Sequence, residues 1–479
     1  MAPTWFATFA LLSWPLVALW LYSTRPAVQA TLWTILGAHL LLPVGASIKF
    51  EGVPQFDKAT IPSLAAFICC ILVARRPVRL VCGFGVTEVL LAICLIGPFI
   101  TSELNTDVIV IGRTVLPALD HYEALSAAVS QFIFLLPFLL GRNLMRTTAD
   151  NTEVFRALVI AGLVYSIPML FEIRMSPQLH TWIYGYFPHS FIQQIRDGGF
   201  RPVVFMGHGL IVAFFAMTAC VAAGVLWRTK TRVLEVLSSG VAATYLGALL
   251  VLCKSLGAQI YGAALLPLVL FTRPRTQVRT ALVLATIALA YPMLRAADLF
   301  PDAKLVEMAR WESDERADSL KFRFEQDRQL LERASERFFF GWGRFGRARV
   351  YHPVSGDDLT TTDGHWIITM GQFGWLGFLA EFGLLTWPVF RARSALRFAG
   401  STHEKLLLAA LALLVAVAAV DLLPNGFLTP WTWLLAGALL GRAEALCSLK
   451  ASNRRSDMQQ VAGATAIPAA WEESASRPG

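Results

Sequence analysis

Charged residues are scarce in this sequence of 479 residues: they make up only 15% of it, whereas soluble domains carry roughly 25%. Hydrophobic residues make up 56%. This composition argues against a soluble enzyme. The apolar residues also fall into runs that approach ~20 residues, the length that carries an α-helix across the hydrocarbon core of a bilayer. The sequence therefore predicts an all-α polytopic membrane protein, because helices satisfy their own backbone hydrogen bonds in lipid.

Several motifs that carry enzyme chemistry are also absent. The sequence has no GxxxxGKS or GxxxxGKT phosphate loop, no HExxH, no GxSxG and no CxxC. Its seven cysteines lie mostly in or beside apolar segments, and no two are spaced as in a metal site or a disulfide framework. ATP hydrolysis, zinc proteolysis and serine hydrolysis therefore lack sequence support. We expect no metal and no cofactor.

Positive charge is in excess, with 41 Lys and Arg against 33 Asp and Glu, a net charge of +8. We expect no nucleic-acid partner, because the cations cluster in alternate connections between apolar runs, where they orient a membrane protein with its positive loops inside. This rule places the N-terminus outside and the C-terminus inside. The clusters are Arg25; Arg75, Arg76 and Arg79; Arg142 and Arg146; Arg228, Lys230 and Arg232; Arg273, Arg275 and Arg279; Arg391, Arg393 and Arg397; and Arg442, Lys450, Arg454 and Arg455.

Span length and charge together predict about thirteen transmembrane helices. Ten lie in residues 1–296, a periplasmic loop follows at 297–366, three more spans lie in 367–441, and 442–479 form a cytoplasmic tail expected to be disordered beyond residue 450. Residues 1–4 lack the basic start of a signal peptide, so the first apolar run is interpreted as a span. The predicted spans are 5–24, 28–46, 59–74, 80–100, 124–141, 155–173, 202–227, 233–253, 256–272, 280–296, 367–390, 404–422 and 427–441.

The loop at 297–366 is far longer than the usual ~4 to 6 residues, which indicates a folded functional element or disorder. Composition favours folding. Residues 319–337 have apolar residues along one face and charge pairs at helical spacing, namely Arg323/Asp327, Glu325/Arg328 and Arg328/Glu332. A solvated surface helix explains most of these charges. The following residues, 338–347, alternate aromatics and glycines with Arg344 and Arg347, which suits anionic lipid or sugar phosphate.

His365 follows Asp363 at the end of this loop and is predicted to lie at the outer membrane boundary. An imidazole suits proton transfer near neutral pH, but position alone favours the alternative of a structural or merely exposed histidine. Arg201 lies at the mouth of a span, where it could bind a diphosphate or extend to lipid headgroups. His208, about two turns into the same predicted span, is interpreted mainly as a hydrogen-bonding group between helices.

Ionisable residues inside the membrane are costly unless they are paired or face water. Glu88 and Glu381 are therefore candidates for lining a cavity, together with His208 and Asp363. Glu88 lies deepest by the predicted span boundaries. Lys254 and Asp421 are further candidates for lining such a pathway, with the alternative that they only mark span ends.

Residues 341–388, GWGRFGRARVYHPVSGDDLTTTDGHWIITMGQFGWLGFLAEFGLLTWP, resemble the O-antigen ligase and Wzy-type polysaccharide polymerase superfamily. In that family a long outer loop ends in a glycine-rich turn, then a histidine, then a glycine-containing helix before a late span. Two further parts are similar: GGFRPVVFMGHG at 198–209, and PFLLGRNL at 137–144 with PFITSELN at 98–105. The likeness covers most of the chain in span count, but its specific motifs cover only about a fifth.

The resemblance implies a GT-C-like membrane fold and a metal-independent enzyme of the bacterial inner membrane. Such an enzyme joins a glycan carried on undecaprenyl diphosphate to an acceptor hydroxyl at the periplasmic face. Carried over by motif, Arg201 and Arg323 would hold the diphosphate and His365 would be catalytic. Trp366 replaces the asparagine that often follows the histidine, and an acidic residue often found shortly afterwards is replaced around 371–372. Both departures concern the acceptor side of the reaction.

The resemblance favours a glycosyltransferase that polymerises lipid-linked repeats into a surface polysaccharide. An O-antigen ligase, which moves finished polymer to lipid A-core, is the first alternative. A transporter or flippase, suggested by the span count and intramembrane acids, is the second, and a non-enzymatic sensor is the third. Expected partners are the undecaprenyl-diphosphate-linked donor, an acceptor glycan or lipid A-core, and membrane lipids; a chain-length regulator and a flippase are further candidates.

Overall fold

The computed structural model describes residues 4–49, 54–196, 198–235, 237–311 and 313–465, with the side chains of all of these except residues 316 and 449–465. In these ranges it has sixteen α-helices and three short antiparallel β-ribbons. The helices are α1 (Trp5–Thr24), α2 (Ala27–Leu41), α3 (Thr60–Leu72), α4 (Val86–Glu103), α5 (His121–Leu144), α6 (Thr148–Met175), α7 (Leu179–Tyr184), α8 (Gly209–Arg228), α9 (Ser239–Leu252), α10 (Leu256–Phe271), α11 (Pro274–Ala296), α12 (Asp302–Arg310), α13 (Asp314–Ser335), α14 (His365–Ala395), α15 (Thr402–Asp421) and α16 (Pro430–Thr465). The ribbons pair β1 (Ser47–Ile48) with β2 (Phe56–Asp57), β3 (Ile109–Ile111) with β4 (Thr114–Leu116), and β5 (Ile195–Arg196) with β6 (Gly199–Phe200).

Long apolar helices dominate the fold. Eight are long and apolar enough to cross a membrane, namely α1, α4, α5, α6, α8, α11, α14 and α15. The helices α2, α3, α9 and α10 are apolar but shorter. Each of the thirteen predicted spans overlaps one of these helices or α16. The structure is therefore consistent with an all-α membrane protein, while the full count of thirteen crossings stays a prediction.

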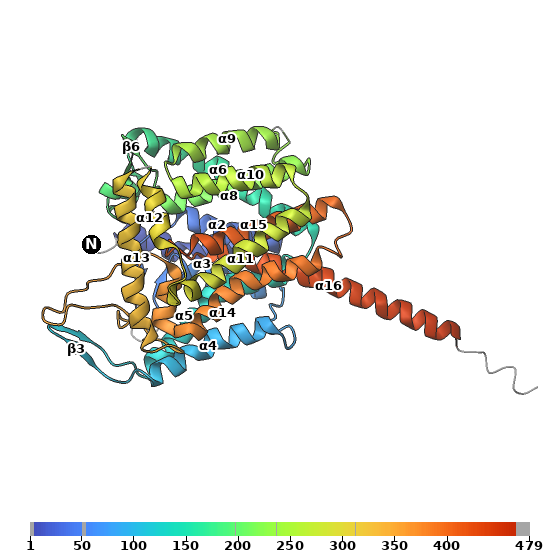
Figure 1. The fold of residues 1–479 in the computed structure, drawn as a ribbon. Coiled ribbons are helices and arrows are strands. Elements are labelled where there is room, and N and C mark those ends of the chain that lie inside the picture. Colours follow the sequence, from blue (N-terminus) through green and yellow to red (C-terminus); the bar gives the residue numbers. More distant parts are fainter. Residues whose placement is uncertain (1–3, 50–53, 197, 236, 312, 466–479) are drawn as a thin grey trace, which may run out of the picture.

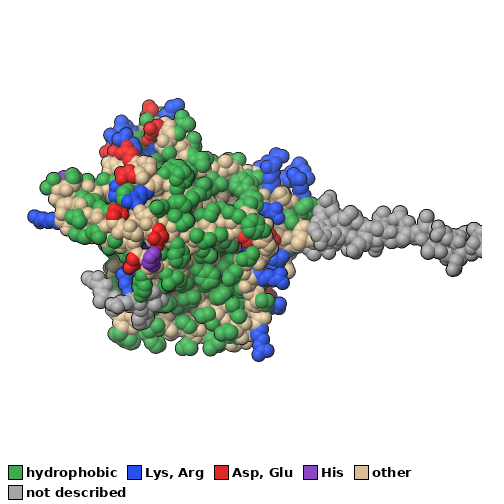
Figure 2. All heavy atoms as spheres, turned by 90° about the horizontal axis from the view of Figure 1, so that it is seen from below, with side chains coloured by type: hydrophobic (Ala, Val, Ile, Leu, Met, Phe, Trp, Pro, Cys, Tyr) green, Lys and Arg blue, Asp and Glu red, His purple; other side chains and the backbone are tan. Residues whose placement is uncertain are grey.

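Large apolar side chains cover the outside of the helical bundle. Leu16 on α1, Ile167 on α6 and Ile260 on α10 expose 68%, 72% and 55% of their surfaces. Figure 2 shows hydrophobic side chains across the middle of one face of the bundle, with charged side chains gathered towards its margins. Lipid tails are as apolar as these side chains, so the surface suits a bilayer better than water.

Elements outside the apolar helices gather at one end of the bundle, which we name the loop end. It carries β3, β6, α12 and α13 and the start of the chain, whereas α16 leaves from the opposite end, here named the tail end (Figure 1). The first helix joins the loop end through Thr4, whose hydroxyl donates to the carbonyl of Tyr184 at 2.7 Å.

The tail end is held together by buried ion pairs. Arg142 at the end of α5 is only 3% exposed, and its Nη2 lies 2.8 Å from Glu88 of α4 and 2.7 Å from Glu444 of α16. Arg442 of α16 donates to the hydroxyl of Thr148 at 3.0 Å. Arg142 and Arg442 belong to the clusters predicted to face the cytoplasm, and they meet at this one end. The sidedness itself stays a prediction.

Three helices, α4, α8 and α9, begin six or seven residues later than the sequence predicts, and a glycine of positive φ precedes the first two. The span predicted from residue 80 starts at Val86, because the preceding stretch contains Pro77 and has Gly83 at a φ of 126°. The span predicted from residue 202 starts at Gly209, where Gly207 has a φ of 89°. Neither glycine conformation is compatible with a right-handed helix.

The loop predicted at residues 297–366 is named the outer loop after its predicted placement. It contains two helices, α12 and α13, followed by irregular chain up to α14. Two of the three predicted charge pairs on α13 are confirmed: the Nε of Arg328 lies 3.8 Å from both Glu325 and Glu332. Arg323 pairs instead with Asp363, which lies near the end of the loop.

The predicted disordered tail begins as helix. The backbone of α16 continues to Thr465, and residues 466–479 of the predicted tail lie outside the described residues. Helix-forming alanine, arginine, glutamine and methionine residues without proline explain the extension.

Candidate functional site

A break in α14 builds the candidate site. Gly374 has φ 68° and ψ −168°, a combination that is essentially restricted to glycine. It divides α14 into a short half-helix at 365–373 and a long half-helix at 375–395. A Cβ atom on Gly374 would lie 2.4 Å from the carbonyl carbon of Phe339. Both the backbone angles and the close neighbour therefore require glycine here.

The outer-loop segment 338–343 fills this break. The amides of Trp342 and Gly343 donate at 2.8 Å to carbonyls at the end of the short half-helix. The first two amides of the long half-helix donate to the carbonyls of Phe338 and Phe339, at 2.8 and 3.2 Å. A non-helical break inside a membrane helix is tolerated where other parts of the protein bind its backbone amides and carbonyls. Segment 338–343 provides these hydrogen bonds.

The break brings His365 against Glu381. Their side chains meet at 2.6 Å between Nε2 and Oε1, although they are sixteen residues apart. In a straight α-helix that separation would be about 24 Å. The His365 side chain is 15% exposed and that of Glu381 is 8% exposed. The pair is therefore a largely buried imidazole–carboxylate contact, of the kind that orients a histidine for proton transfer.

Neighbouring groups fix both partners. The hydroxyl of Thr369 donates to the second carboxylate oxygen of Glu381 at 3.2 Å. The backbone amide of His365 donates to the carbonyls of Leu422 (2.9 Å) and Asn425 (3.2 Å). The connection between α15 and α16 therefore holds the start of α14. With Nε2 bonded to Glu381, Nδ1 is the ring nitrogen left to meet a substrate.

Arg323 of α13 pairs with Asp363, which precedes the histidine by two residues in the chain. Its Nε is 3.3 Å from Asp363 Oδ2, with the two side chains 40% and 37% exposed. The amide of Thr361 donates to the side-chain oxygen of Gln326 at 2.8 Å, which fastens the end of the loop to α13. These contacts place Arg323 next to the residues that lead directly into His365.

Asp327 lies one helical turn after Arg323 on α13. Burial raises the pKa of its carboxyl group to about 7. Asp363 raises this pKa further, while Arg295 and Arg323 act in the opposite direction. The outer side of the site therefore holds two carboxyl groups and two guanidinium groups in mutual electrostatic contact.

The segment leading into α8 brings Arg201 to the same region. The Arg201 Nε donates to the carbonyl of Lys254 at 2.9 Å. His208 is the N-cap of α8, where its Nδ1 accepts the amide of Leu210 at 3.1 Å. It thus lies before the helix and not two turns inside it.

The environment of the buried His208 ring includes several charged or titratable groups. The pKa of His208 falls to about 4, mainly because the ring is buried. His189, and after it Arg201 and Arg323, lower this pKa further through their charges. Phe427, from the connection after α15, stacks on that ring with 5.3 Å between the ring centroids.

Glu88 is not part of this cluster. It lies in the first turn of α4, at the tail end, and its partner is Arg142 at 2.8 Å. Its predicted depth depended on a span starting at residue 80, and the later helix start moves it to a helix end. We leave Glu88 out of the candidate site.

Arg347, which was also predicted to bind the diphosphate, lies away from this cluster and binds backbone carbonyls. Its side chain is fully buried, and Nη1 donates to the carbonyls of Asp107 and Pro117, both at 2.8 Å. It fastens the ends of the β3–β4 ribbon to the outer loop. Arg344 is half-buried, and within the described residues no acceptor bonds its Nη1. Arg347 is therefore a structural residue, while Arg344 stays only a candidate for binding anions.

Sequence reasoning missed Glu172 on α6. Its side chain is fully buried and accepts the amides of Leu179 (3.0 Å), Val203 (2.7 Å) and Val204 (2.7 Å). It thereby shapes the irregular segment between Arg201 and α8. The signal was present in the sequence, because an acid inside a predicted span requires partners.

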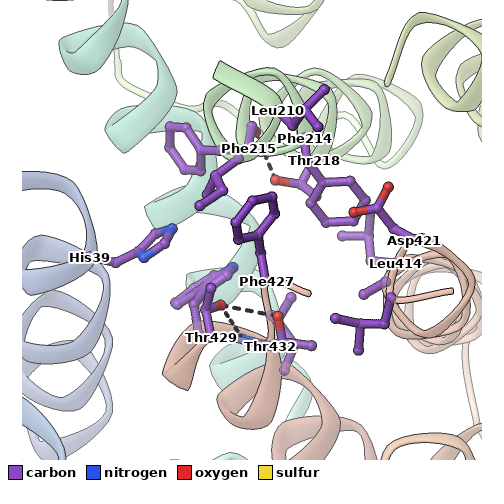
Figure 3. A pocket seen from close by; sticks show the side chains of 15 residues that line it. His39, Leu210, Phe214, Phe215, Thr218, Leu414, Asp421, Phe427, Thr429 and Thr432 are labelled. Carbon is purple, nitrogen blue, oxygen red and sulfur yellow. Dashed lines mark hydrogen bonds between the residues drawn. The ribbon is translucent and has the colours of Figure 1, made fainter. Parts of the chain in front are cut away.

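A narrow cavity lies behind Phe427, between α2, α8, α15 and α16 (Figure 3). His39 and Asp421 stand on its opposite sides. It offers about 40 Å³, which holds a few water molecules, since one needs about 10–15 Å³ on this measure. It is too small for a sugar. The side chain of Asn425 donates to Asp421 at 3.0 Å, so this cavity adjoins the connection that holds His365.

The site thus defines a membrane-embedded helical protein with a histidine–glutamate pair and two arginines at its loop end. The chain matches no protein-family model and no curated protein. In the part of the chain that the structure describes, no three His, Cys, Asp or Glu side chains are arranged to hold a metal ion.

Proposed function

We propose that this protein is an integral membrane glycosyltransferase that polymerises undecaprenyl-diphosphate-linked oligosaccharide repeats into a surface polysaccharide. The reaction would take place at the periplasmic face of the bacterial inner membrane. The observation that carries the proposal is the buried contact between His365 and Glu381, with Arg323 paired to Asp363 two residues before that histidine and Arg201 at the start of the segment that leads into α8. This arrangement supplies a proton acceptor and two cations.

In the proposed reaction the acceptor hydroxyl attacks the anomeric carbon of the donor. Its proton moves to Nδ1 of His365, and Glu381 stabilises the imidazolium that forms. The new carbon–oxygen bond replaces the bond to phosphate, whose electrons leave with undecaprenyl diphosphate. Arg201 and Arg323 stabilise that leaving charge, which is the role of guanidinium groups at a transferring phosphate. A single displacement of this kind inverts the anomeric centre.

The apolar exterior supports the same reaction, because a polyprenyl chain reaches the site only through the bilayer. The site lies at the loop end of the bundle, where the headgroup of such a lipid would lie. A location at this boundary therefore fits a substrate with a membrane-bound tail and a soluble glycan head.

The test measures the glycan left on the polyprenyl carrier in cells that lack the protein. Cells complemented with the wild type are compared with cells carrying His365→Ala. His121→Ala is a matched control, because His121 also begins a helix and also contacts a glutamate at 2.6 Å, but it is 90% exposed and lies on α5.

Single repeats accumulating in the deletion and His365→Ala strains, with long chains restored by His121→Ala, would support the polymerase. Long polymer trapped on the carrier would point to a ligase that uses the same chemistry with another acceptor. Unchanged surface glycan and carrier pools in the deletion strain would refute both enzymes. Transport that survives the loss of His365 would then favour a transporter.

A further inference from the structure

A second concave site lies in the outer loop beside His365. It has a volume of about 440 Å³, within the ~300–1,000 Å³ typical of small-molecule sites. Its walls come from α13, the glycine-rich turn after it, the chain around Tyr351, and the short half-helix of α14. The lining residues are Leu330, Gly343, Gly346, Ala348, Arg349, Tyr351, Thr362, Ile367, Ile368 and Gln372.

This cavity opens beside the same helical face that carries the histidine. Ile368 and Gln372 follow His365 by three and seven residues on the short half-helix, so the three side chains lie on one side of it. Thr362 precedes His365 by three residues. A molecule in the cavity would therefore lie along the face of the short half-helix that carries the imidazole, although His365 itself is not one of the lining residues.

Two polar side chains in the cavity have capacity for a ligand. Thr362 and Gln372 are both half-buried, and within the described part of the chain no hydrogen bond is found to the Thr362 hydroxyl or the Gln372 side-chain amide. The backbone carbonyl of Gln372 is already used by Gly343, so only its amide group is available. A hydroxyl and an amide are both donors and acceptors, as sugar hydroxyls require.

The cavity carries no unbalanced charge among its described lining residues. Arg349 is the charged member, and its guanidinium pairs with Asp358. An acidic sugar or a phosphate in a partly buried site needs an unpaired cation to offset its lost hydration. The lining therefore favours a neutral ligand with many hydroxyl groups over an anionic one.

We propose that this cavity binds the acceptor end of the growing glycan and that the sugar it holds is neutral. The inference rests on the proposed function, since it assigns the second substrate of the same reaction. The diphosphate of the donor would lie on the side of Arg201 and Arg323, and the acceptor hydroxyl would approach His365 from the cavity. Thr362 and Gln372 would bind the acceptor sugar, and Tyr351 would form part of the wall behind it.

The experiment uses the full-length protein in proteoliposomes with lipid-linked donor isolated from the deletion strain. The acceptor probe is the free oligosaccharide repeat released from that donor by mild acid. Transfer to the probe and release of undecaprenyl diphosphate are measured separately as the probe concentration varies. The variants are Thr362→Val and Gln372→Leu, which keep side-chain size. Gln329→Leu is the control, because Gln329 bonds Glu325 on the exposed face of α13.

Thr362→Val and Gln372→Leu should each raise KM for the probe about three- to ten-fold, the effect of one lost hydrogen bond. KM for the donor and the rate of its slow hydrolysis should not change, and Gln329→Leu should match the wild type. Mass spectrometry should find a neutral sugar at the accepting end of the repeat.

Three results would count against the proposal in different ways. An unchanged KM for the probe in both variants, with active wild type, would refute the cavity assignment while leaving the glycosyltransferase standing. A uronic acid or phosphate on the accepting sugar would refute the neutral ligand class. A wild-type protein that neither transfers glycan nor releases undecaprenyl diphosphate would overturn the proposed function, and the cavity assignment with it.

Discussion

His365 and Glu381 form a 2.6 Å contact between two halves of one broken helix. A histidine held in this way has one ring nitrogen fixed, and in the proposed reaction the other meets the substrate. The carboxylate also stabilises the protonated ring once the acceptor's proton has moved. Glu381 is thus a positioning residue for the proposed reaction, and it acts through the imidazole.

Glu381→Gln should lower kcat for glycan transfer about 10- to 100-fold, with KM for donor and acceptor nearly unchanged. The amide keeps the size of the side chain but removes the charge that stabilises imidazolium. Steady-state kinetics in proteoliposomes would measure the change. Glu103→Gln, which alters the exposed partner of His121, provides the control. A rise in KM with normal kcat would show that Glu381 serves binding instead.

Arg323→Ala should reduce turnover about 10²- to 10³-fold, the usual loss when one charge-stabilising donor is removed. Arg323→Lys should recover part of this loss, because a point charge remains without the two-pronged geometry. Arg328→Ala is the matched control on the same helix, where it contacts Glu325 and Glu332. Equal activity of the Arg323 and Arg328 variants, at equal membrane levels, would remove Arg323 from the site.

Gly374→Ala should destabilise the protein. The backbone angles at Gly374 cost a residue with a Cβ roughly 1–3 kcal/mol, and the new atom would also press on Phe339. A thermal unfolding curve of the purified protein in detergent should show a lower Tm. Gly257→Ala on α10 is the control, since nothing lies within 4 Å of its added Cβ, and its Tm should stay the same or rise.

Asp327→Asn should change how stability depends on pH. Its carboxyl has a pKa of about 7 in the folded protein, above the usual 3.8. The folded state therefore binds more protons than the unfolded state between these values, so this group makes stability fall as pH rises from about 4 to 7. The asparagine variant should show a flatter Tm between pH 5 and 8 and a higher Tm than wild type at pH 8. Parallel Tm curves for the two proteins would contradict this assignment.

Sequence was informative wherever the structure depends on local composition. The helices at 5–24 and 402–421 nearly coincide with predicted spans, because their apolar length alone determines them. His365 was also found from the sequence, since it lies where the outer loop meets a span. Its partner Glu381 was recognised only as an acid inside the membrane that needs an explanation.

The pairing of these two residues could not be predicted, because it depends on one backbone reversal. Gly374 is one of several glycines between residues 364 and 383, and nothing in the sequence separates it from Gly371 or Gly377. What distinguishes it is the carbonyl of Phe339 beside its Cα, a contact formed by residues far away in the chain. The structural role of Arg347 could not be predicted for a similar reason. The carbonyls that its guanidinium binds belong to residues 107 and 117, far away in the chain, so the sequence suggested phosphate binding instead.

Segment 338–343, which fills the break in α14, also bears on how the protein is assembled. A backbone amide or carbonyl without a hydrogen-bond partner costs several kcal/mol in lipid. At the break in α14, four hydrogen bonds with this segment satisfy such groups. The segment precedes α14 in the chain, so it is synthesised before that helix. The packing of the two half-helices of α14 therefore depends on this segment, because its hydrogen bonds join them across the break.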